Sequence, residues 1–474
     1  MPGKFYITTT TPYVNGEPHI GFAKEIIFAD VIARWRTLMG DEVRFNTGTD
    51  EHGQKIYEKA CELGKEPQDY ADELAPRFEA LKEPLNLSFT DFSRTSSEQH
   101  KKAAQEMWNR CNDNGYIYKA KHKIKYCVGC ELEKTDSELD KEGKCPIHPN
   151  RELEVREEDN YFFRFSALQD KLLGYYESNL NFVIPDFRFN EIKTFVKSGL
   201  HDFSISRLKN KMPWGVLVPK DPDHVMYVWF DALVIYISPL GWPERADFDG
   251  WWPGVQVCGK DNLRQQTAIW QAMLMAAGLP NSKQVTVLGF ITSGGQKMSK
   301  SLGNVVNPLD IVNEYGTDAL RYFLMREITS FEDGDFTLAR FKEAYNANLA
   351  NGLGNLASRI MKMAQDNLDG PVSIPEKTIP QGFIDSMNKY EIQKATDFIW
   401  TEISRLDGLI QSSQPFKLVK SEPKKGRELI AELVIDLYTL ARMLNPFLPA
   451  TSEAIKSAVR ANKSFSSPLF PRKN

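Results

Sequence analysis

Near the N-terminus the chain alternates between short apolar blocks and one longer stretch with apolar residues at helical spacing. This pattern predicts a strand, a helix with Gly40 as its C-terminal cap, and a second strand, at residues 5–10, 18–39 and 43–46. A strand, a helix and a strand in this order predict a parallel crossover unit. Because ligands bind beyond the carboxyl ends of parallel strands, we expect Tyr13, His19 and Asp50 to lie together at one sheet edge.

The regular pattern is interrupted in the middle of the chain. From about residue 116 to about 224 it breaks into short, charged segments that contain cysteines. Beyond them the alternation returns, with strands, a helix and a further strand predicted at residues 225–229, 255–258, 263–277 and 284–288. A parallel sheet interrupted by an inserted module explains this order best.

The C-terminal part of the chain has a different period. Apolar residues recur at three- and four-residue steps through residues 338–363, 392–410 and 429–444, and Pro446 ends the last stretch. This indicates a helical bundle, in which the charged residues 420–427 are expected to form a short linker. The chain therefore divides into five predicted segments: 1–115, first half of the α/β domain; 116–224, insertion; 225–293, second half of the α/β domain; 294–337, loop and connecting segment; and 338–474, helical domain.

The composition, 42% hydrophobic and 26% charged, is that of an ordinary globular chain. No apolar run approaches the ~18 residues that cross a bilayer, and no signal peptide is evident, so we expect a cytoplasmic protein without a membrane partner. The net charge of −4 is uneven: residues 340–474 contain 19 Lys and Arg against 14 Asp and Glu, a net of +5, which leaves −9 elsewhere. This favours a nucleic-acid partner for the helical domain, but ordinary scatter of surface charge explains it equally well.

Three of the six cysteines lie close together in the predicted insertion. They form the pattern Cys127-Val-Gly-Cys130 followed by Cys145-Pro-Ile-His148. Three thiols and one imidazole at this spacing predict a knuckle that binds one Zn²⁺. Four protein ligands leave no obvious open position on the ion, which favours a structural role over a catalytic one. The ion would hold together a segment with few apolar residues. Chance clustering and a redox role are the alternatives.

Two segments far apart in the sequence suit the phosphates of a nucleotide. His19 begins the predicted helix, where free backbone N–H groups and the helix dipole attract anions. The segment Gly294-Gly295-Gln-Lys297-Met-Ser-Lys300 offers two ammonium groups on a flexible backbone. Such groups would stabilise the charge that develops when a carboxylate attacks the α-phosphorus of ATP and pyrophosphate leaves. A histidine at a helix start is more often structural, so this hypothesis depends on the lysine loop.

These two segments carry a family resemblance. Pro18-His19-Ile20-Gly21 and Lys297-Met298-Ser299-Lys300-Ser301 are similar to the two signature motifs of class I aminoacyl-tRNA synthetases, and the chain resembles the methionine-specific family over nearly its whole length. The resemblance implies an α/β fold: a Rossmann-type parallel sheet catalytic domain with a zinc-bearing insertion, followed by an all-α anticodon-binding bundle. It implies that methionine and ATP give methionyl-adenylate and pyrophosphate, with Mg²⁺ accompanying ATP. The methionyl group would then pass to the 3′-terminal adenosine of methionine tRNA, initiator and elongator.

The resemblance also implies roles for individual residues. The catalytic residues would be His19, Lys297 and Lys300, and ATP would also contact Gly21, Gly259 and Asp261. The methionine-binding residues would be Tyr13, Asp50, Trp229, Ala232, Tyr236 and Gln266. Aromatic side chains suit a polarizable thioether, although such residues near strand ends are more often core. The tRNA anticodon would be read by Asn355, Arg359 and Phe416, which without the resemblance would be ordinary surface residues.

The sequence departs from the family pattern at three positions. Phe22 and Gln266 each stand where a histidine is usual, and Phe416 replaces a tryptophan. Phe22 removes a possible phosphate donor, so we hypothesise a slower activation step or replacement by a nearby cation. Gln266 can still donate and accept a hydrogen bond, and Phe416 can still stack on a base but has lost the indole N–H.

Two other functions compete with methionine activation. Synthetases for isoleucine, valine or leucine carry a large editing insertion because one methylene gives only ~1–3 kcal/mol of discrimination, and residues 116–224 are too few for one. A paralogue that binds tRNA without aminoacylation would not need both Lys297 and Lys300. The chain ends soon after the predicted bundle, and we expect a monomer.

Overall fold

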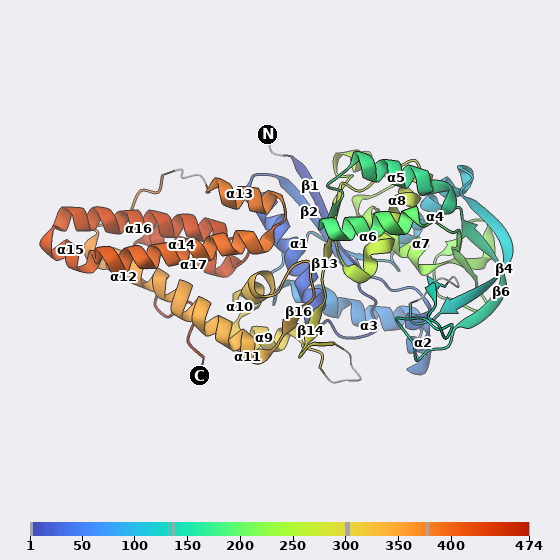
Figure 1. Ribbon diagram of the computed structural model, residues 1–474, viewed down its shortest axis with the longest axis horizontal. Coiled ribbons are helices and arrows are strands. Elements are labelled where there is room, and N and C mark those ends of the chain that lie inside the picture. Colours follow the sequence, from blue (N-terminus) through green and yellow to red (C-terminus); the bar gives the residue numbers. More distant parts are fainter. Residues whose placement is uncertain (1–2, 131, 135–137, 299–303, 376–378, 474) are drawn as a thin grey trace.

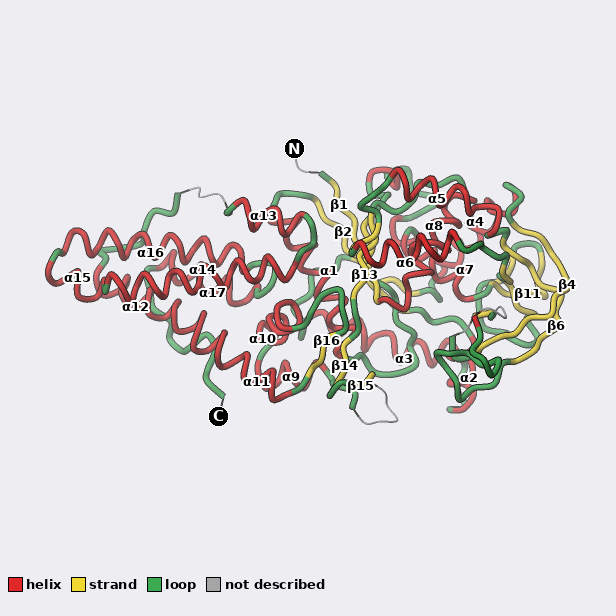
Figure 2. Tube along the Cα trace, in the orientation of Figure 1, coloured by secondary structure: helices red, strands yellow, loops and turns green. Residues whose placement is uncertain are grey.

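The computed structural model describes residues 3–130, 132–134, 138–298, 304–375 and 379–473. A parallel sheet lies in the middle of an elongated molecule, between a helical bundle at one end and strands of the insertion at the other (Figure 1). Figure 2 shows that strands dominate the end opposite the bundle, where β4 and β6 form a long curved pair. The predicted order of an α/β domain followed by an all-α domain is confirmed.

The central sheet has six strands, all parallel, in the order β3-β2-β1-β12-β13-β7. The strands are β1 (Lys4–Thr9), β2 (Glu42–Thr49), β3 (Asp91–Arg94), β7 (Val183–Ile184), β12 (Val255–Gly259) and β13 (Gln284–Leu288). The order reverses between β1 and β12, and in doubly wound sheets ligands bind beyond the strand ends at such a reversal. The sheet is therefore of the predicted Rossmann type, with its expected binding edge beside β1.

Helices cover both faces of this sheet. Because alternate residues of each strand point to opposite faces, one strand contributes to two buried cores. On β1, Phe5 and Ile7 belong to one buried core, whereas Tyr6 between them belongs to another. The first core contains α1 (Ile20–Leu38) and α3 (Pro67–Glu79), and the second contains α4 (Glu98–Asp113), α5 (Gln169–Ser178), α6 (Asp186–Lys197) and α8 (Trp270–Ala276). The short α2 (Gln54–Glu62) follows β2.

The insertion consists mainly of antiparallel strands in two small sheets, ordered β5-β4-β6-β8 and β10-β11-β9. They are β4 (Ile117–Cys127), β5 (Leu132–Glu133), β6 (Glu154–Phe163), β8 (Phe203–Ser204), β9 (Ser206–Leu208), β10 (Leu217–Val218) and β11 (Asp221–Met226). The sequence did not predict that β7, which lies within residues 116–224, pairs with β13 as an edge strand of the central sheet. A strand of two residues is too short to produce a detectable period.

The predicted strand at residues 225–229 is partly wrong. β11 ends at Met226, and the helix α7 (Val228–Ala232) begins two residues later. The N–H of Tyr227 still donates to the carbonyl of Ile205, between β8 and β9 (2.8 Å), but the Tyr227 carbonyl already accepts from the N–H of Phe230 (2.9 Å). The run of β-branched and aromatic residues suggested a continuing strand, whereas the tertiary position of Tyr227 starts a helix.

The segment after the sheet begins with a hairpin. β14 (Ile291–Ser293) pairs with β15 (Gln296–Lys297) and with β16 (Gly334–Phe336). Gly294 and Gly295 connect β14 to β15 with φ angles of 61° and 75°, which side chains with a Cβ rarely adopt. Residues 299–303, which include Lys300, lie outside the described residues. The helices α9 (Pro308–Tyr315) and α10 (Thr317–Tyr322) lead from here toward the bundle.

The bundle extends away from the sheet, with α15 at its far end (Figure 1). Its helices are α11 (Leu338–Ala344), α12 (Asn355–Asn367), α13 (Gln381–Asn388), α14 (Ile392–Ser413), α15 (Pro415–Ser421), α16 (Pro423–Leu444) and α17 (Pro449–Ala461). The expected linker at residues 420–427 is wrong, because only Glu422 lies outside both α15 and α16. Pro423 occupies the first turn of α16, where proline starts a helix instead of breaking one.

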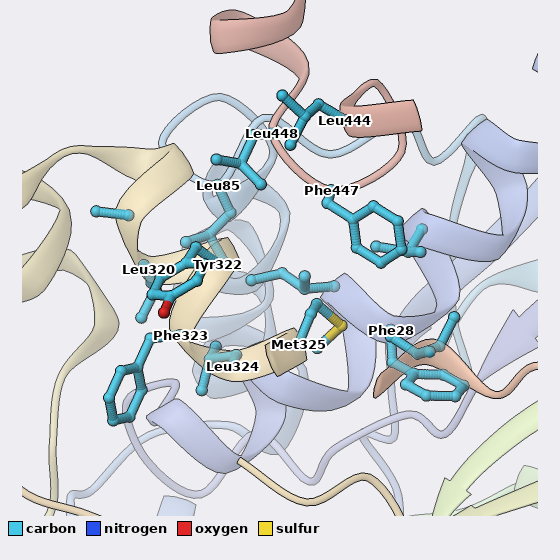
Figure 3. Close-up of a cluster of buried hydrophobic side chains, with 14 of the residues drawn as sticks. Phe28, Leu85, Leu320, Tyr322, Phe323, Leu324, Met325, Leu444, Phe447 and Leu448 are labelled. Atoms are coloured by element: carbon cyan, nitrogen blue, oxygen red, sulfur yellow. The ribbon is translucent and has the colours of Figure 1, made fainter. Parts of the chain in front are cut away.

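The bundle and the sheet share one continuous core. Figure 3 shows the junction, where Phe28 of α1 lies near Met325 and Phe447, from the segments that follow α10 and α16. Beside it, the Arg321 guanidinium is fully buried, binds Asp30 of α1 (2.6 Å), and donates to the carbonyl of Phe447 (2.8 Å). Burial alone would raise the pKa of Asp30, but Arg321, Arg34 and the hydrogen bonds from Ser88 together lower it.

Candidate active site and metal centre

The N-terminus of α1 forms the first part of the site. His19 is the N-cap residue of α1, and its Nδ1 accepts a hydrogen bond from the N–H of Gly21 (3.1 Å). A Cβ at position 21 would lie 2.9 Å from the His19 ring, so this close arrangement requires glycine. The His19 side chain is exposed at this helix end, where the helix dipole attracts anions.

The hairpin of β14 and β15, which contains Lys297 and is the lysine hairpin, lies next to the N-terminus of α1. A Cβ at Gly21 would be 4.0 Å from the Met298 methyl group, and the Ile20 N–H donates to Val306 O (3.0 Å). Met298 and Val306, which flank residues 299–303 in the chain, therefore both lie beside the first turn of α1. In this way the structure brings the two sequence motifs together. The backbone of Lys297 pairs with Thr292 in the hairpin, and the position of Lys300 falls outside the described residues.

The predicted methionine-binding residues gather at the ends of β1 and β2. Tyr13 and Asp50 form a parallel β-bridge, and the Tyr13 and Trp229 rings meet edge to face with centroids 6.3 Å apart. The Asp50 side chain is buried, and its carboxylate accepts from the Thr95 hydroxyl (3.4 Å). Ala232 ends α7 beside these rings. The aromatic rings of Tyr13 and Trp229 therefore lie close to a buried carboxylate.

Gln266 lies in a buried hydrogen-bond chain behind the aromatic rings. It donates to the Tyr236 hydroxyl, and its Oε1 accepts from Gln256 Nε2 (2.9 Å). The Tyr236 phenol is fully buried, and burial raises its pKa. The predicted helix at residues 263–277 begins with a π-helical turn, Gln265–Ile269, before α8. Such turns are often found at functional sites, and this one places Gln266 toward Tyr236.

The end of β12 forms the opposite side of the binding edge. Gly259 ends the strand, and a Cβ there would lie 2.8 Å from Asp261 Oδ1, so a larger residue would displace the Asp261 carboxylate. The Glu25 side chain of α1 also lies beside Gly259, and its carboxylate accepts from the Thr10 N–H (2.8 Å). Burial raises the pKa of Glu25 to about 7, although the bonds from Thr10 oppose the shift. Glu25 belongs to no motif, so its buried position could not be predicted from the sequence.

A second buried group supports the methionine-binding residues. The Asp231 carboxylate binds His52 Nδ1 (2.6 Å) and His100 Nε2 (2.8 Å), and all three side chains are buried. Burial would raise the pKa of Asp231, but the two histidines outweigh it and lower the pKa to about 2. Asp231 adjoins Ala232, and His52 follows Asp50, so this carboxylate connects the two sides of the site. Sequence reasoning missed it because the three residues are far apart in the chain.

Phe22 is part of the core and does not face solvent beside His19. Its ring is buried and contacts the ring of Phe78 on α3 edge to face, with centroids 5.7 Å apart. The side chain at this position therefore stabilises the contact between α1 and α3.

The four predicted metal ligands converge. The Sγ atoms of Cys127, Cys130 and Cys145 and one ring nitrogen of His148 all lie within 4.8 Å of one another. The Cys130 and Cys145 sulfur atoms are 3.4 Å apart, and Cys130 Sγ is 3.2 Å from His148 Nδ1. A Cβ at Gly129 would lie 2.4 Å from the His148 ring. These separations fit a tetrahedral ion with Zn–S distances of ~2.3 Å.

The predicted anticodon-binding residues lie on the bundle, far from the sheet (Figure 1). Asn355 is exposed at the start of α12, and Arg359 one turn later forms an ion pair with Asp407 of α14. Phe416 lies on α15 with 46% of its side chain exposed, and Lys417 Nζ is 6.0 Å from its ring centroid. A large exposed aromatic ring beside a cation suits stacking on a base.

Comparison with known proteins identifies relatives of the chain. The family model described as tRNA synthetases class I (M) matches residues 5–153 and 148–361. Methionine–tRNA ligase of Thermosynechococcus vestitus is 40% identical, over 99% of this chain and 93% of the relative. The same enzyme of Nostoc sp. is 41% identical, over 95% of this chain and 89% of the relative.

A solved structure is also similar over the full length. Methionyl-tRNA synthetase of Mycobacterium tuberculosis, in complex with methionyl-adenylate, superimposes with a TM-score of 0.90 at 33% identity. The match covers 99% of this chain and 100% of the solved chain. Among the residues described here, no helix combines the length and apolar character needed to cross a membrane.

Proposed function

The chain belongs to the methionine-specific family of class I tRNA synthetases, and on this premise we propose which of its residues perform each step. The family reaction joins methionine to tRNA at the expense of ATP. The observation that carries our assignment is the convergence of the His19 helix end and the lysine hairpin beyond the strand ends. These are the two positively polarised elements that a departing pyrophosphate requires.

Activation takes place where the sheet order reverses. The Asp50 carboxylate holds the methionine α-ammonium, and Tyr13, Trp229, Ala232, Tyr236 and Gln266 surround the thioether. The ATP ribose lies against Gly259 and Asp261, and His19, Gly21, Lys297 and Lys300 hold the phosphates. Mg²⁺ bound with ATP would neutralise phosphate charge. Holding both substrates in line supplies much of the remaining acceleration.

The other groups serve the RNA and the fold. Asn355, Arg359 and Phe416 read the anticodon, and residues 294–337 connect that domain to the catalytic sheet. One Zn²⁺ on Cys127, Cys130, Cys145 and His148 is structural, because four protein ligands leave no open position. The protein acts as a cytoplasmic monomer.

Amino-acid-dependent ATP–pyrophosphate exchange tests the activation step. We expect exchange with methionine alone among the twenty amino acids, and a loss of at least about 100-fold in Lys300→Ala. Lys283→Ala, at an exposed lysine after α8, is the matched control and should retain the wild-type rate. Exchange with another amino acid would mean that Gln266 and its neighbours accept a different substrate. No exchange with any amino acid would contradict the assignment.

A further inference from the structure

The lysine hairpin is connected to the central sheet by a short backbone segment that other parts of the fold hold in place. Gly289 and Phe290, the hairpin joint, lie between the end of β13 and the start of β14. The joint has backbone hydrogen bonds to Ser330 (3.0 Å) and Gly334 (2.9 Å). Its remaining carbonyl and N–H are bound by two charged side chains from distant elements, so these side chains help to set the direction in which the hairpin leaves the sheet.

Lys24 of α1 holds the carbonyl of the joint. Its side chain is buried, and its Nζ donates to the carbonyls of Gly289 (2.9 Å) and Thr329 (2.8 Å). Burial lowers the pKa of Lys24 to about 7, and the amine and the ammonium both carry enough hydrogens for these bonds. Because His19 is the N-cap of the same helix, Lys24 connects the joint directly to the helix that is assigned to the phosphates.

Asp333 holds the N–H of the joint. Its Oδ1 accepts from the N–H of Phe290 (3.0 Å), and its Oδ2 binds Lys260 Nζ (2.7 Å). Burial would raise the pKa of Asp333, but the Lys260 ammonium and the Phe290 N–H outweigh burial and lower it. Lys260 lies between Gly259 and Asp261, the two residues assigned to the ATP ribose. Asp333 therefore connects the joint to the turn that follows β12.

The side chain of the joint packs against the same turn. A Cβ at Gly259 would lie 3.8 Å from the Phe290 ring, and Lys260 Nζ lies 4.6 Å from the centroid of that ring. An ammonium over an aromatic face adds a favourable contact to its ion pair with Asp333. The joint is therefore held between α1 on one side and the ribose turn on the other.

Beyond the joint, the hairpin is held to β16 along its length. β14 pairs with β16, and the Asp335 carboxylate of β16 accepts from the Thr292 hydroxyl and from the Gly295 N–H, both at 2.8 Å. The backbone of Lys297 pairs in turn with Thr292. Because these bonds make the hairpin and β16 one unit, a displacement at the joint would also displace the backbone of Lys297.

We propose that Lys24 and Asp333 are positioning residues for amino-acid activation, an inference that rests on the proposed function. By holding the joint against α1 and the ribose turn, they set where Lys297 lies relative to the departing pyrophosphate. Electrostatic stabilisation requires donors that are in place before the reaction, and a misplacement of about 1 Å can cost on the order of 100-fold in rate. A purely structural role for both residues is the alternative, and the two roles differ in the kinetic steps that they affect.

Asp333→Ala and Lys24→Met remove the two contacts separately. The Asp333 side chain is 43% exposed, so its removal should leave the protein folded, and methionine keeps roughly the volume of the buried lysine. We expect each variant to lower the kcat of ATP–pyrophosphate exchange at least about tenfold, with the KM for methionine within about twofold of wild type. Methionyl transfer from preformed adenylate to tRNA should also stay within about twofold, because pyrophosphate has already left.

Three further variants serve as controls. Asp333→Asn keeps an oxygen that can accept from the Phe290 N–H and should recover part of the lost rate. Asp113→Ala and Lys389→Met, at exposed positions that end α4 and follow α13, should exchange at the wild-type rate. A normal exchange rate in both Asp333→Ala and Lys24→Met would overturn the proposal. An equal loss of exchange and transfer in Asp333→Ala would overturn it too, because general destabilisation affects both steps. Absence of exchange in the wild-type protein would instead contradict the proposed function.

A double-mutant cycle tests whether Asp333 acts through the hairpin. Lys297→Ala removes the group that the joint is proposed to position, so adding Asp333→Ala to it should lower the exchange rate by no more than about twofold. In the wild-type background the same Asp333→Ala change should lower the rate at least about tenfold. If the two losses multiply in the double variant, Asp333 acts independently of Lys297 and the proposal is overturned.

Discussion

Glu25 is the residue whose protonation should affect stability most directly. Its pKa of about 7 in the folded protein lies above its ordinary value of 4.5. The neutral form is favoured by folding, so this stabilisation is complete below pH ~4.5 and is lost as the pH rises through about 7. A shift of this size corresponds to about 3 kcal/mol for a fully buried group. Lys24, whose pKa burial lowers to about 7, changes stability only above this window.

Glu25→Gln should remove this dependence, because an amide cannot ionise. We expect its free energy of unfolding to vary less between pH 4.5 and 7 than that of the wild type, by about 3 kcal/mol. Urea unfolding at several pH values measures the difference. Glu42→Gln, at an exposed acid that begins β2, should keep the wild-type slope. Parallel slopes for Glu25→Gln and wild type would show that Glu25 ionises normally.

Phe22→His introduces the side chain that the family resemblance predicts at this position and tests the role of the phenylalanine. The imidazole would lose part of its hydration against Phe78, so we expect a loss of about 1–3 kcal/mol in the free energy of unfolding. Phe22→Leu, which stays apolar, should cost less. Pyrophosphate exchange measured on the same proteins tests the slow-activation hypothesis, which requires a faster rate with histidine. An unchanged rate would rule it out.

At the residue scale, the sequence predicted the groups that carry motifs better than the groups that support them. Spacing was sufficient for Cys127 and His148, because four metal ligands must meet at one point. The contact of His52 and His100 with Asp231 was not predictable, since their approach depends on how α4 and α7 pack. No periodic pattern records a contact between isolated polar residues.

Among the structural elements, the metal knuckle has the most direct test. We expect one Zn²⁺ per wild-type chain, none in Cys145→Ser, and a lower melting temperature for that variant, because the ion supplies folding energy to a small module. Elemental analysis and thermal unfolding measure both effects. Cys61→Ser, at an exposed cysteine on α2, should retain zinc and stability. Full zinc content in Cys145→Ser would contradict the ligand assignment.

The elements themselves followed the apolar pattern where it was long. The strand, helix and strand at the N-terminus and the long helices α14 and α16 were predicted because each repeats its period several times. The failures were short: β7 has two residues, and the strand predicted at residues 225–229 becomes helical after β11. In both cases a partner from elsewhere in the chain decides the backbone conformation, which local pattern does not encode.

At the scale of the whole molecule, Arg321 joins the catalytic sheet to the bundle. Replacing it with methionine leaves Asp30 buried with Arg34 as its ion-pair partner among the described residues. It also leaves the carbonyls of Pro446 and Phe447 without their donor. We expect Arg321→Met to lower the free energy of unfolding by about 3–5 kcal/mol. Urea unfolding checks this, with Lys59→Met as an exposed control that should show no measurable change. A small effect for Arg321→Met would mean that apolar contacts alone hold the junction.

Phe416→Trp tests whether the bundle reads RNA. Because Phe416 is exposed on α15, an indole ring should fit there and add a hydrogen-bond donor. We expect the ratio of kcat/KM between a methionine tRNA and a variant altered at the first anticodon base to rise about fivefold, the scale of one added hydrogen bond. Pyrophosphate exchange, which needs no tRNA, should not change. A constant ratio would contradict the role of Phe416.

The continuous core between sheet and bundle fixes the position of the bundle relative to the sheet. Since Phe28, Met325 and Phe447 pack into one apolar mass, α15 cannot rotate freely about the sheet. The distance between the sheet and α15 is thus fixed, and an RNA that contacts both must match this distance. Adding one helical turn to both α14 and α16 would move α15 outward by about 5.4 Å. Such a protein should still activate its amino acid, yet favour an RNA with a longer arm.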